Sequence, residues 1–567
     1  MNSVNDLLQR SLQFARGLSE SDGRMRDAYE TEYGENYSPA CFSVMAAAAW
    51  RLHQRPEDLE WAFRWGHRAA AIMRESPYLR EYMLGYTALV FTLLDPSPEL
   101  ERLRQDFVAS SQPEEPLSPL GHILALQLVG DVLCPRNPAS LERADRILTL
   151  LEELWTPAGF PEDRKERDDG SIPHAYLTVA CLVIFLLAKP ASESARKLQP
   201  RIEALIRRAC DWFYRANGPA MFAVQANRSY NQLWTYPLYA LLAYVHRGPP
   251  AAPVIEKCLT VVTRTTANLA RPNFLPTGLS PYASAGNEPY NRVNNDIGAG
   301  GVGWALLAVL QANGFKGLAP QAAATEPVFV DADAGYAFFH SARNGAALVL
   351  RQHKWHYHLP LQPTWLVLDG ATAPFIGAKR AGVNHPLTAL IPEPSRINPW
   401  LEPYFGILAS TKAGIYHRMD EPVHSLPGNV FQAALRPAGT AVPNAPQVSV
   451  QVAPEADGIV FTYRLGGEVP EEPWLSVPVL LWDGAHELGY RIKGATVELE
   501  WAGHKYGLTA EALTEAAEGH PAATALSQTW LLRRERFNQT GFGVTGNFAL
   551  ALGPVRAVRV RVGKQSP

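Results

Sequence analysis

The sequence changes its hydrophobic period once, and this change constrains the fold more than any other feature. From about residue 38 to 313, apolar residues recur at the three-to-four-residue spacing of an amphipathic helix. After Thr325 the pattern becomes short alternating runs, rich in β-branched and aromatic residues and separated by turn residues. The switch predicts a helical domain over residues 1–322, followed by an antiparallel β-sheet domain over residues 323–567.

The helical part contains eleven predicted helices, which break at Pro and Gly clusters such as 135–138 and 248–250. They come in pairs with a combined period of about 40 to 50 residues and without a strict repeat, which fits an α-solenoid or a closed α/α toroid. The long non-helical stretches 156–172 and 270–295 favour the toroid, because its loops gather at one mouth and line a cleft. The predicted helices span 39–53, 57–75, 79–94, 97–109, 118–133, 139–155, 173–188, 193–215, 229–246, 252–269 and 296–313.

The second part contains alternating runs that predict strands of a β-sandwich or of stacked antiparallel sheets. Turn residues separate the runs, and the boundary between the two parts of the chain lies near residues 315–328, where Gly314, Gly317 and a run of alanines intervene. The runs are 335–342, 346–353, 364–370, 447–453, 458–465, 495–502, 542–552 and 557–563.

The charge balance limits the partners that the chain can have. The formal net charge is −3 over 567 residues, so no surface-wide positive potential is available for a nucleic acid. A local basic cleft for an acidic ligand is compatible with this balance. The longest apolar stretch, 175–188, is about 14 residues and too short to span a bilayer, so no membrane partner is expected. The sequence carries no signal for an oligomeric state.

The cysteines and the first residues indicate the compartment. Asp6, Gln9 and Arg10 interrupt any apolar run near the start, so no secretory signal peptide is expected. An odd number of widely spaced cysteines favours free thiols over disulfides, and therefore a reducing, cytoplasmic location. The five cysteines are Cys41, Cys134, Cys181, Cys210 and Cys258.

A polar segment opens the helix predicted at 229–246. Asn227, Arg228, Asn231 and Gln232 offer hydrogen-bond donors within about two helical turns, with Trp234 immediately after them. A helix N-terminus adds partial positive charge, so the cluster suits a carboxylate ligand. The alternative is an ordinary capped helix whose polar residues face a loop.

A second polar segment, 281–296, precedes the last helix of the helical part. It contains Tyr282 and Tyr290 together with Glu288, Arg292 and Asp296. Asn295 or Asp296 fits the role of a cap for that helix, but capping accounts for one residue and not for the whole segment. The remaining residues predict a binding or catalytic loop.

Two further segments carry groups that can transfer protons. His356 and His358 lie two apart, which places both on one face of a strand. They fit a metal pair, a base with an orienting neighbour, or a polar strand edge, although two histidines alone are a weak zinc signal. Asp168 and Asp169 precede the helix predicted at 173–188, where they would serve a hydrolase or cap the helix.

These segments, in this order, resemble the heparinase and alginate-lyase group of polysaccharide lyases. Asn227-Arg228 resembles the Asn-His pair of that group, with arginine where histidine is usual. The stretch from His356 to Gly370 resembles its His-x-His segment, which leads into an apolar strand and a Gly turn, but 359–361 reads Leu-Pro-Leu where an acid is expected. The tyrosine-rich loop 282–290 matches the place where the group carries its catalytic tyrosine. The resemblance implies an α/α toroid followed by an antiparallel β-sandwich.

The resemblance further implies β-elimination on a uronate-containing oligo- or polysaccharide. Asn227, Arg228 and Asn231 would neutralise the uronate carboxylate, so that the enolate formed at C5 is stabilised. Arg228 or Arg292 would depress the pKa of a tyrosine enough for it to act as base. Trp234 would stack on a sugar face or belong to the core.

In this scheme the proton transfers fall to Tyr282 or Tyr290 and to His356 or His358. No metal or other cofactor is required.

Two other functions fit the same sequence. A glycoside hydrolase on a toroid needs two carboxyl groups about 5 to 10 Å apart. Asp168, Asp169, Glu288 and Asp296 are the candidates for that pair. A non-catalytic glycan-binding protein is the third possibility, because an arginine replaces the usual histidine at 228 and the acid after His358 is missing.

Overall fold

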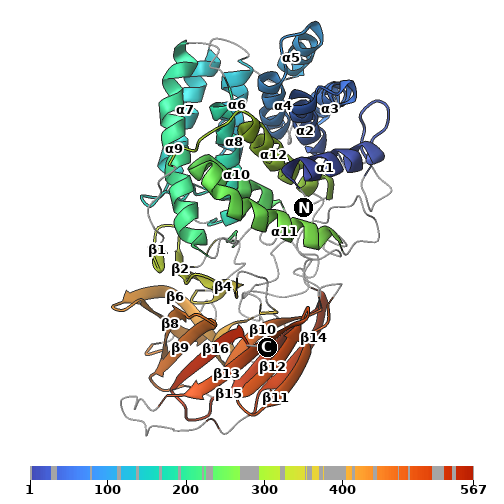
Figure 1. The fold of residues 1–567 in the computed structure, drawn as a ribbon. Coiled ribbons are helices and arrows are strands. Elements are labelled where there is room, and N and C mark those ends of the chain that lie inside the picture. The colour runs from blue at the N-terminus through green and yellow to red at the C-terminus, as the bar shows by residue number, and fades with distance from the viewer. Residues whose placement is uncertain are drawn as a thin grey trace. The chain divides into compact units, whose positions relative to one another are not determined.

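The chain divides into two compact units in a computed structural model (Figure 1). The helical unit comprises Met1–Tyr214 and Ser229–Ala323, and the β unit comprises Arg215–Arg228 and Ala324–Pro567. The sequence placed this change of architecture between residues 322 and 323. The structure describes residues 3–26, 35–76, 80–110, 116–135, 139–164, 169–188, 193–219, 223–224, 226, 234–267, 293–319, 326–351, 353, 360–369, 374–375, 404–410, 416–437, 443–469, 472–482, 486–513, 526, 529–538 and 544–565.

The helical unit is built from long helices, as the period predicts. Each predicted helix overlaps an observed one, and one more, α1, precedes them. A capping box begins α1: the Ser3 hydroxyl accepts from the Asp6 N–H, and the Asp6 carboxylate accepts from the Ser3 N–H. The helices are α1 (Val4–Leu18), α2 (Ser38–His53), α3 (Pro56–Glu75), α4 (Arg80–Leu93), α5 (Pro98–Ser110), α6 (Gly121–Leu133), α7 (Ala139–Leu154), α8 (Ile172–Val183), α9 (Glu193–Asn217), α10 (Thr235–Arg247), α11 (Ala252–Ala267) and α12 (Val293–Ala312).

The even-numbered helices contact one another in a closed cycle. Helix α2 packs against α4, α4 against α6, α6 against α8, α8 against α10, α10 against α12, and α12 against α2. Close approach depends on small residues: a Cβ added at Gly85 of α4 would lie 2.6 Å from a methyl of Leu126 on α6. In α2, every residue from Ser38 to Ala49 is buried. A helix buried on all sides needs apolar or small residues around its whole circumference, which these helices have.

Most odd-numbered helices are amphipathic and pack on an even-numbered one, whereas α5 packs mainly on α3. Helix α3 contacts α2, α7 contacts α6, α11 contacts α10, and α1 contacts α12. In α9, Ile202, Leu205 and Ile206 are buried while Arg207 and Arg208 are exposed. This period of three to four residues marks a helix with one face toward the core.

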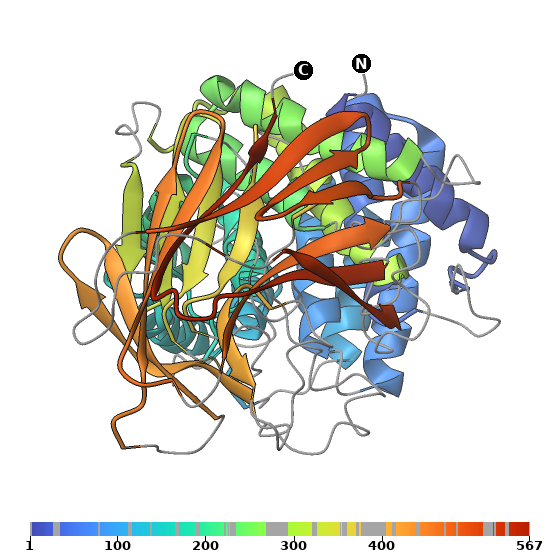
Figure 2. The same cartoon turned by 90° about the horizontal axis from the view of Figure 1, so that it is seen from below.

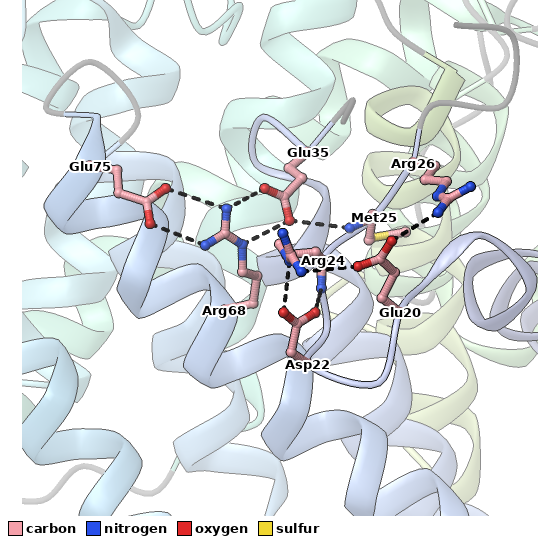
Figure 3. Close-up of polar contacts among 8 residues, drawn as sticks. All are labelled: Glu20, Asp22, Arg24, Met25, Arg26, Glu35, Arg68 and Glu75. Carbon is pink, nitrogen blue, oxygen red and sulfur yellow. Dashed lines mark hydrogen bonds and ion pairs between the residues drawn. The ribbon is translucent and has the colours of Figure 1, made fainter. Parts of the chain in front are cut away.

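A network of ion pairs holds the chain between α1 and α2 against α3 (Figure 3). The Arg68 guanidinium on α3 binds both carboxylate oxygens of Glu35, with 2.8 Å between Nε and Oε1, and also contacts Glu75 at 3.2 Å. Glu35 accepts in addition from the backbone N–H of Met25 at 3.2 Å. Since Glu35 is almost fully buried, the bidentate guanidinium compensates for the lost hydration of its carboxylate.

The β unit contains two antiparallel sheets in the described residues (Figure 2). The smaller has the order β1-β2-β3-β4, and the larger has the order β11-β12-β13-β16-β9-β8-β7-β6-β5-β10-β15-β14. The strands are β1 (Val328–Asp331), β2 (Tyr336–His340), β3 (Gly345–Val349), β4 (Pro363–Val367), β5 (Gly406–Ser410), β6 (Tyr416–Leu426), β7 (Val430–Pro437), β8 (Gln447–Pro454), β9 (Gly458–Gly466), β10 (Pro473–Trp482), β11 (Gly489–Lys493), β12 (Thr496–Trp501), β13 (His504–Ala512), β14 (Leu531–Asn538), β15 (Val544–Ala551) and β16 (Ala557–Lys564).

The larger sheet curves so that strands far apart in its order meet. The ring of Tyr490 on β11 lies 5.8 Å from that of Phe548 on β15, although these strands stand near opposite ends of the order. The indole of Trp530, which precedes β14, donates to the Ala495 carbonyl in the turn before β12 at 2.8 Å. Alternate residues of the strands, such as Ile459 and Phe461 on β9, face a single apolar core.

The end of helix α9 belongs to the β unit. The Arg215 guanidinium lies 3.8 Å from the centre of the Phe329 ring and 3.8 Å from the Glu326 carboxylate. The β unit therefore includes a short piece of chain that the sequence assigned to the helical part. In the described residues of both units, no helix has the length and apolar character needed to cross a membrane.

Candidate active site

Aromatic and imidazole rings connect the N-termini of five even-numbered helices. Tyr37 precedes α2 and stacks on Tyr82 in the first turn of α4, with ring centres 4.8 Å apart. Tyr82 lies 6.0 Å from His122 of α6, and His122 lies 4.8 Å from His174 of α8. His174 in turn meets Trp234, the residue before α10, at 6.5 Å. Because each helix N-terminus carries partial positive charge, their meeting creates a region that favours an anion.

A chain of hydrogen bonds runs through the same rings. The Tyr82 hydroxyl lies 2.8 Å from His122 Nε2, and His122 Nδ1 lies 2.6 Å from Asp163 Oδ1. The same Asp163 oxygen accepts from the backbone N–H of His122 at 3.0 Å, which caps the start of α6. Gly121 donates its N–H to the Asp163 carbonyl at 2.8 Å. Asp163 is therefore fixed in place by side-chain and backbone contacts together.

The three side chains of this hydrogen-bonded series differ in how far they are buried. The side chains of His122 and Asp163 are 1% and 0% exposed, whereas Tyr82 is only half-buried. Burial by itself would raise the pKa of the Asp163 carboxyl, but the neighbouring His122, and after it His174, hold that pKa well below its usual range. Asp163 is thus a carboxylate, which can only accept hydrogen bonds.

The loop before α8 surrounds this chain with further buried polar groups. Glu162 accepts from the N–H groups of Gly170 at 2.7 Å and Asp163 at 3.3 Å. Ser171 caps α8, because its hydroxyl oxygen accepts from the His174 N–H at 3.3 Å. The sequence proposed that the acids of segment 168–176 either cap this helix or belong to a hydrolase. In the described residues, the side chain that caps α8 is that of Ser171.

Three of these residues have the chemistry of metal ligands. Asp163, Asp169 and His174 are buried, and a possible ligand atom from each lies within 4.8 Å of the others. The Arg164 guanidinium, however, lies 3.7 Å from the Asp169 carboxylate, and Asp163 Oδ1 already accepts two hydrogen bonds from His122. A cationic side chain beside the same carboxylate opposes a second cation. We therefore do not assign these residues as a metal site.

Of the residues that the sequence predicts for the lyase site, the structure describes Trp234. It is 6% exposed and lies against the His174 ring. The other predicted residues lie outside the described residues: Tyr282, Tyr290, His356, His358, Asn227, Arg228, Asn231 and Arg292. In the sequence, the segment containing Asn227 and Arg228 ends directly before Trp234.

The sequence did not single out Tyr82, His122 or Asp163. His122 is one histidine at the start of an apolar helix, and such a residue is more often part of the core than of a site. Asp163 lies in the stretch 156–172, which the sequence did mark as a functional loop because of its length. A partnership between residues 41 positions apart leaves no local signal in the sequence.

Comparison with known proteins gives similarity in structure alone. No protein-family model matches the chain, and no curated protein matches it. Among solved structures, the chain is similar to heparinase III, with a TM-score of 0.49 and 11% identity over 96% of this chain and 80% of that one. It is also similar to the heparan sulfate lyase from Pedobacter heparinus, with a TM-score of 0.45 and 12% identity over 100% of this chain and 83% of that one. For the chondroitin AC lyase from Streptomyces coelicolor, the TM-score is 0.45 and the identity 12%, over 100% of this chain and 79% of that one.

Proposed function

We propose that the chain is a carbon–oxygen lyase that cleaves a uronate-containing glycan by β-elimination. The observation that carries the proposal is the hydrogen-bonded chain from Tyr82 through His122 to Asp163, placed where five helix N-termini meet. Elimination needs a group that moves a proton and a positive potential for the uronate carboxylate. We further propose that the closed cycle of helices is the inner layer of an α/α toroid, and that the curved sheet is a β-sandwich.

The carboxylate of the substrate would be held at the helix N-termini. Withdrawal of the C5 proton places negative charge on that carboxylate, so donors aimed at it lower the barrier. Asn227, Arg228 and Asn231 directly precede α10 in the sequence, and Arg292 directly precedes α12. We propose these residues as the donors, and Trp234 as a residue that contacts a sugar face.

The sequence candidates offer one proposed assignment of the proton transfers. Tyr282 and Tyr290 stand before α12 in the sequence, and His356 and His358 belong to the β unit. A tyrosine as base and a histidine as acid would suffice for the elimination, and neither role needs a metal or another cofactor.

A glycoside hydrolase is less well supported by the described carboxylates. Its general acid needs a carboxyl group that stays protonated near neutral pH. Asp163 has the opposite property, since its pKa lies well below the usual range. Asp169 has the Arg164 guanidinium beside it, at 3.7 Å from its carboxylate. These two groups suit the stabilisation of a neighbouring cation better than the donation of a proton.

We also propose a reducing compartment, which would be the cytoplasm. All five cysteines are buried and free, and Cys41 and Cys181 have pKa values raised by burial, the latter to about 12. Thiols in this state resist oxidation because the thiolate is the reactive form. Localisation of the full-length protein fused to a fluorescent reporter would test this assignment.

The activity is tested by incubating the purified protein with a panel of acidic glycans. The panel should include heparan sulfate, chondroitin sulfate, hyaluronan, alginate and polygalacturonate. Products should show the ultraviolet absorbance of a 4,5-unsaturated uronate, and one new reducing end should appear for each double bond. New reducing ends without that absorbance would replace the lyase by a hydrolase, and no product from any glycan would contradict both enzymatic functions.

A further inference from the structure

We propose that Tyr82 is the base of this elimination, that His122 takes up and stabilises its proton, and that Asp163 is the positioning residue behind His122. The inference rests on the proposed lyase function and names the residues for one of its steps. It replaces the open choice between Tyr282 and Tyr290 by a tyrosine whose hydrogen-bond partners are described.

The direction of the hydrogen bonds follows from Asp163. Its carboxylate only accepts, so the proton shared between His122 Nδ1 and Asp163 Oδ1 belongs to the imidazole. A neutral imidazole with its proton on Nδ1 has a free lone pair on Nε2. When His122 is in this neutral form, the Tyr82 hydroxyl, 2.8 Å away, donates to Nε2. Passing this proton to Nε2 produces a tyrosinate and an imidazolium, and the Asp163 carboxylate stabilises the imidazolium.

The chemical step can then be written with all atoms accounted for. The tyrosinate oxygen of Tyr82 removes the C5 proton of the uronate, and the electron pair of the C5–H bond forms the C4=C5 double bond. The C4–O4 bond breaks with its electron pair on O4, and the regenerated Tyr82 hydroxyl gives its proton to that oxygen. The products are a 4,5-unsaturated uronate and an alcohol, with Tyr82 again a tyrosinate beside the imidazolium of His122. No oxidant, reductant or water is consumed.

Exposure identifies which member of the chain meets the substrate. His122 and Asp163 are 1% and 0% exposed, so neither can reach a polysaccharide, whereas Tyr82 is half-buried. The ring of Tyr37 stacks on Tyr82 with centres 4.8 Å apart and planes 12° apart, which fixes the orientation of the phenol. Tyr82 lies in the first turn of α4, where the helix dipole stabilises a negative oxygen.

The helical unit supplies matched controls for this assignment. Tyr244 also carries a hydrogen-bonded hydroxyl, which donates to the Phe315 carbonyl at 3.0 Å near the C-terminal end of α10. His246 and Asp211 form another His–Asp contact, in which only the histidine is buried, with the same 2.6 Å separation between the two side chains. These groups lie away from the helix N-termini, so removing them tests the loss of a hydroxyl or of a carboxylate without touching the proposed base.

The test compares Tyr82→Phe with Tyr244→Phe on the glycan that the wild-type protein eliminates. Tyr82→Phe should lower kcat by about 10² or more, because only the base is lost, and Tyr244→Phe should keep most of the activity. Asp163→Asn should also lower kcat with little change in KM and should alter the pH dependence of kcat, because an amide can reverse the imidazole tautomer. Asp163→Glu should recover part of the rate. Melting temperatures of all variants check that they are folded.

The outcomes separate the two proposals. If the wild type eliminates a glycan and folded Tyr82→Phe keeps more than a tenth of its kcat, the assignment of the base is wrong while the lyase function stands. A drop in Asp163→Asn with an unchanged pH profile would reduce Asp163 to a structural role and overturn its place in the chain. If the wild type eliminates none of the glycans, the lyase function fails and the assigned base fails with it.

Discussion

Two His–Asp pairs in the helical unit have the same distance between imidazole nitrogen and carboxylate oxygen but different surroundings. In both, an imidazole nitrogen lies 2.6 Å from a carboxylate oxygen, and both histidines are buried. The Asp163 side chain is fully buried, whereas that of Asp211 is 53% exposed. The other ring nitrogen of His122 lies within hydrogen-bond distance of the Tyr82 hydroxyl. The comparison teaches that a His–Asp contact identifies a candidate site only through its neighbours and its burial.

The position along the helices explains part of this difference. His122 lies at the start of α6, where its own backbone N–H needs an acceptor and finds Asp163. His246 lies in the last turn of α10, and its Nε2 lies 2.6 Å from Asp211 Oδ1. The ring of Tyr214 lies 5.5 Å from His246 and completes its packing. The His122–Asp163 pair connects α6 to the loop before α8 and orients the Tyr82 hydroxyl. The His246–Asp211 pair connects the C-terminal turn of α10 to α9.

The largest difference between the pairs is expected in stability. Asp163→Ala removes the acceptor for a buried imidazole and for a helix N-terminus, and breaking a buried pair costs about 3–5 kcal/mol. The midpoint of urea unfolding, followed by the helical circular dichroism signal, measures the loss. Asp163→Asn serves as the control that keeps the volume of the side chain. If Asp163→Ala lost no more stability than Asp211→Ala, burial would not be what distinguishes the two pairs.

His340, a buried histidine of the β unit, has no carboxylate partner among its described contacts and so extends the comparison. Burial lowers the pKa of His340 to about 4, and backbone carbonyls of Arg215 and Ala216 oppose this only in part. In the unfolded state this histidine becomes protonated near pH 6.5, but in the folded state it stays neutral down to about pH 4. The free energy of unfolding therefore falls as the pH drops from 6.5 to 4. The full loss is on the order of 3 kcal/mol.

The measurement for His340 is the unfolding midpoint of the wild type and of His340→Leu at pH 7.5 and at pH 4.5. The leucine cannot titrate, so the variant should lose less stability on acidification even if it is less stable at pH 7.5. Asp163 acts in the same direction but at lower pH, because a carboxyl with a lowered pKa contributes stability that is lost only as the pH falls below its unfolded value. Equal acid sensitivity of wild type and variant would remove His340 as the cause.

The smallest expected effect is that of Asp211→Ala. Its carboxylate is half-exposed, and contacts of this kind contribute about 0–1 kcal/mol. The unfolding midpoint should shift slightly, and the shift should shrink further in high salt because the contact is screened. A loss as large as that of Asp163→Ala would mean that the exposed pair holds the end of α10 in a way that its burial does not indicate.

Helix and strand positions were predictable where local pattern and burial agree. Helix α9 repeats apolar residues every three to four positions, and strand β9 alternates them, so each period follows directly from the side chains that face the core. Helix α1 carried a local signal as well, in the capping box of Ser3 and Asp6, but lay outside the region to which the helical period was assigned.

Strand β10 shows where local pattern misleads. It begins at Pro473 and contains Pro478, and a proline within a run argues against a strand. Strand β5 pairs with β10 only from Pro473 to Ser476, so the proline at 478 interrupts no hydrogen bond to β5. Whether a missing N–H matters depends on which neighbour stands beside it, and this is a property of the assembled sheet.

By itself the sequence predicted a helical and an antiparallel β architecture, and it marked the loop 156–172 as a region of interest. Each of these follows from residues close together in the chain, since period, caps and loop length are local properties. Only the tertiary structure decided that His122 meets Asp163 and Tyr82, because α4, α6 and the loop before α8 must first pack side by side. A hydrogen bond across 41 residues depends on that packing, and no local pattern of either segment encodes it.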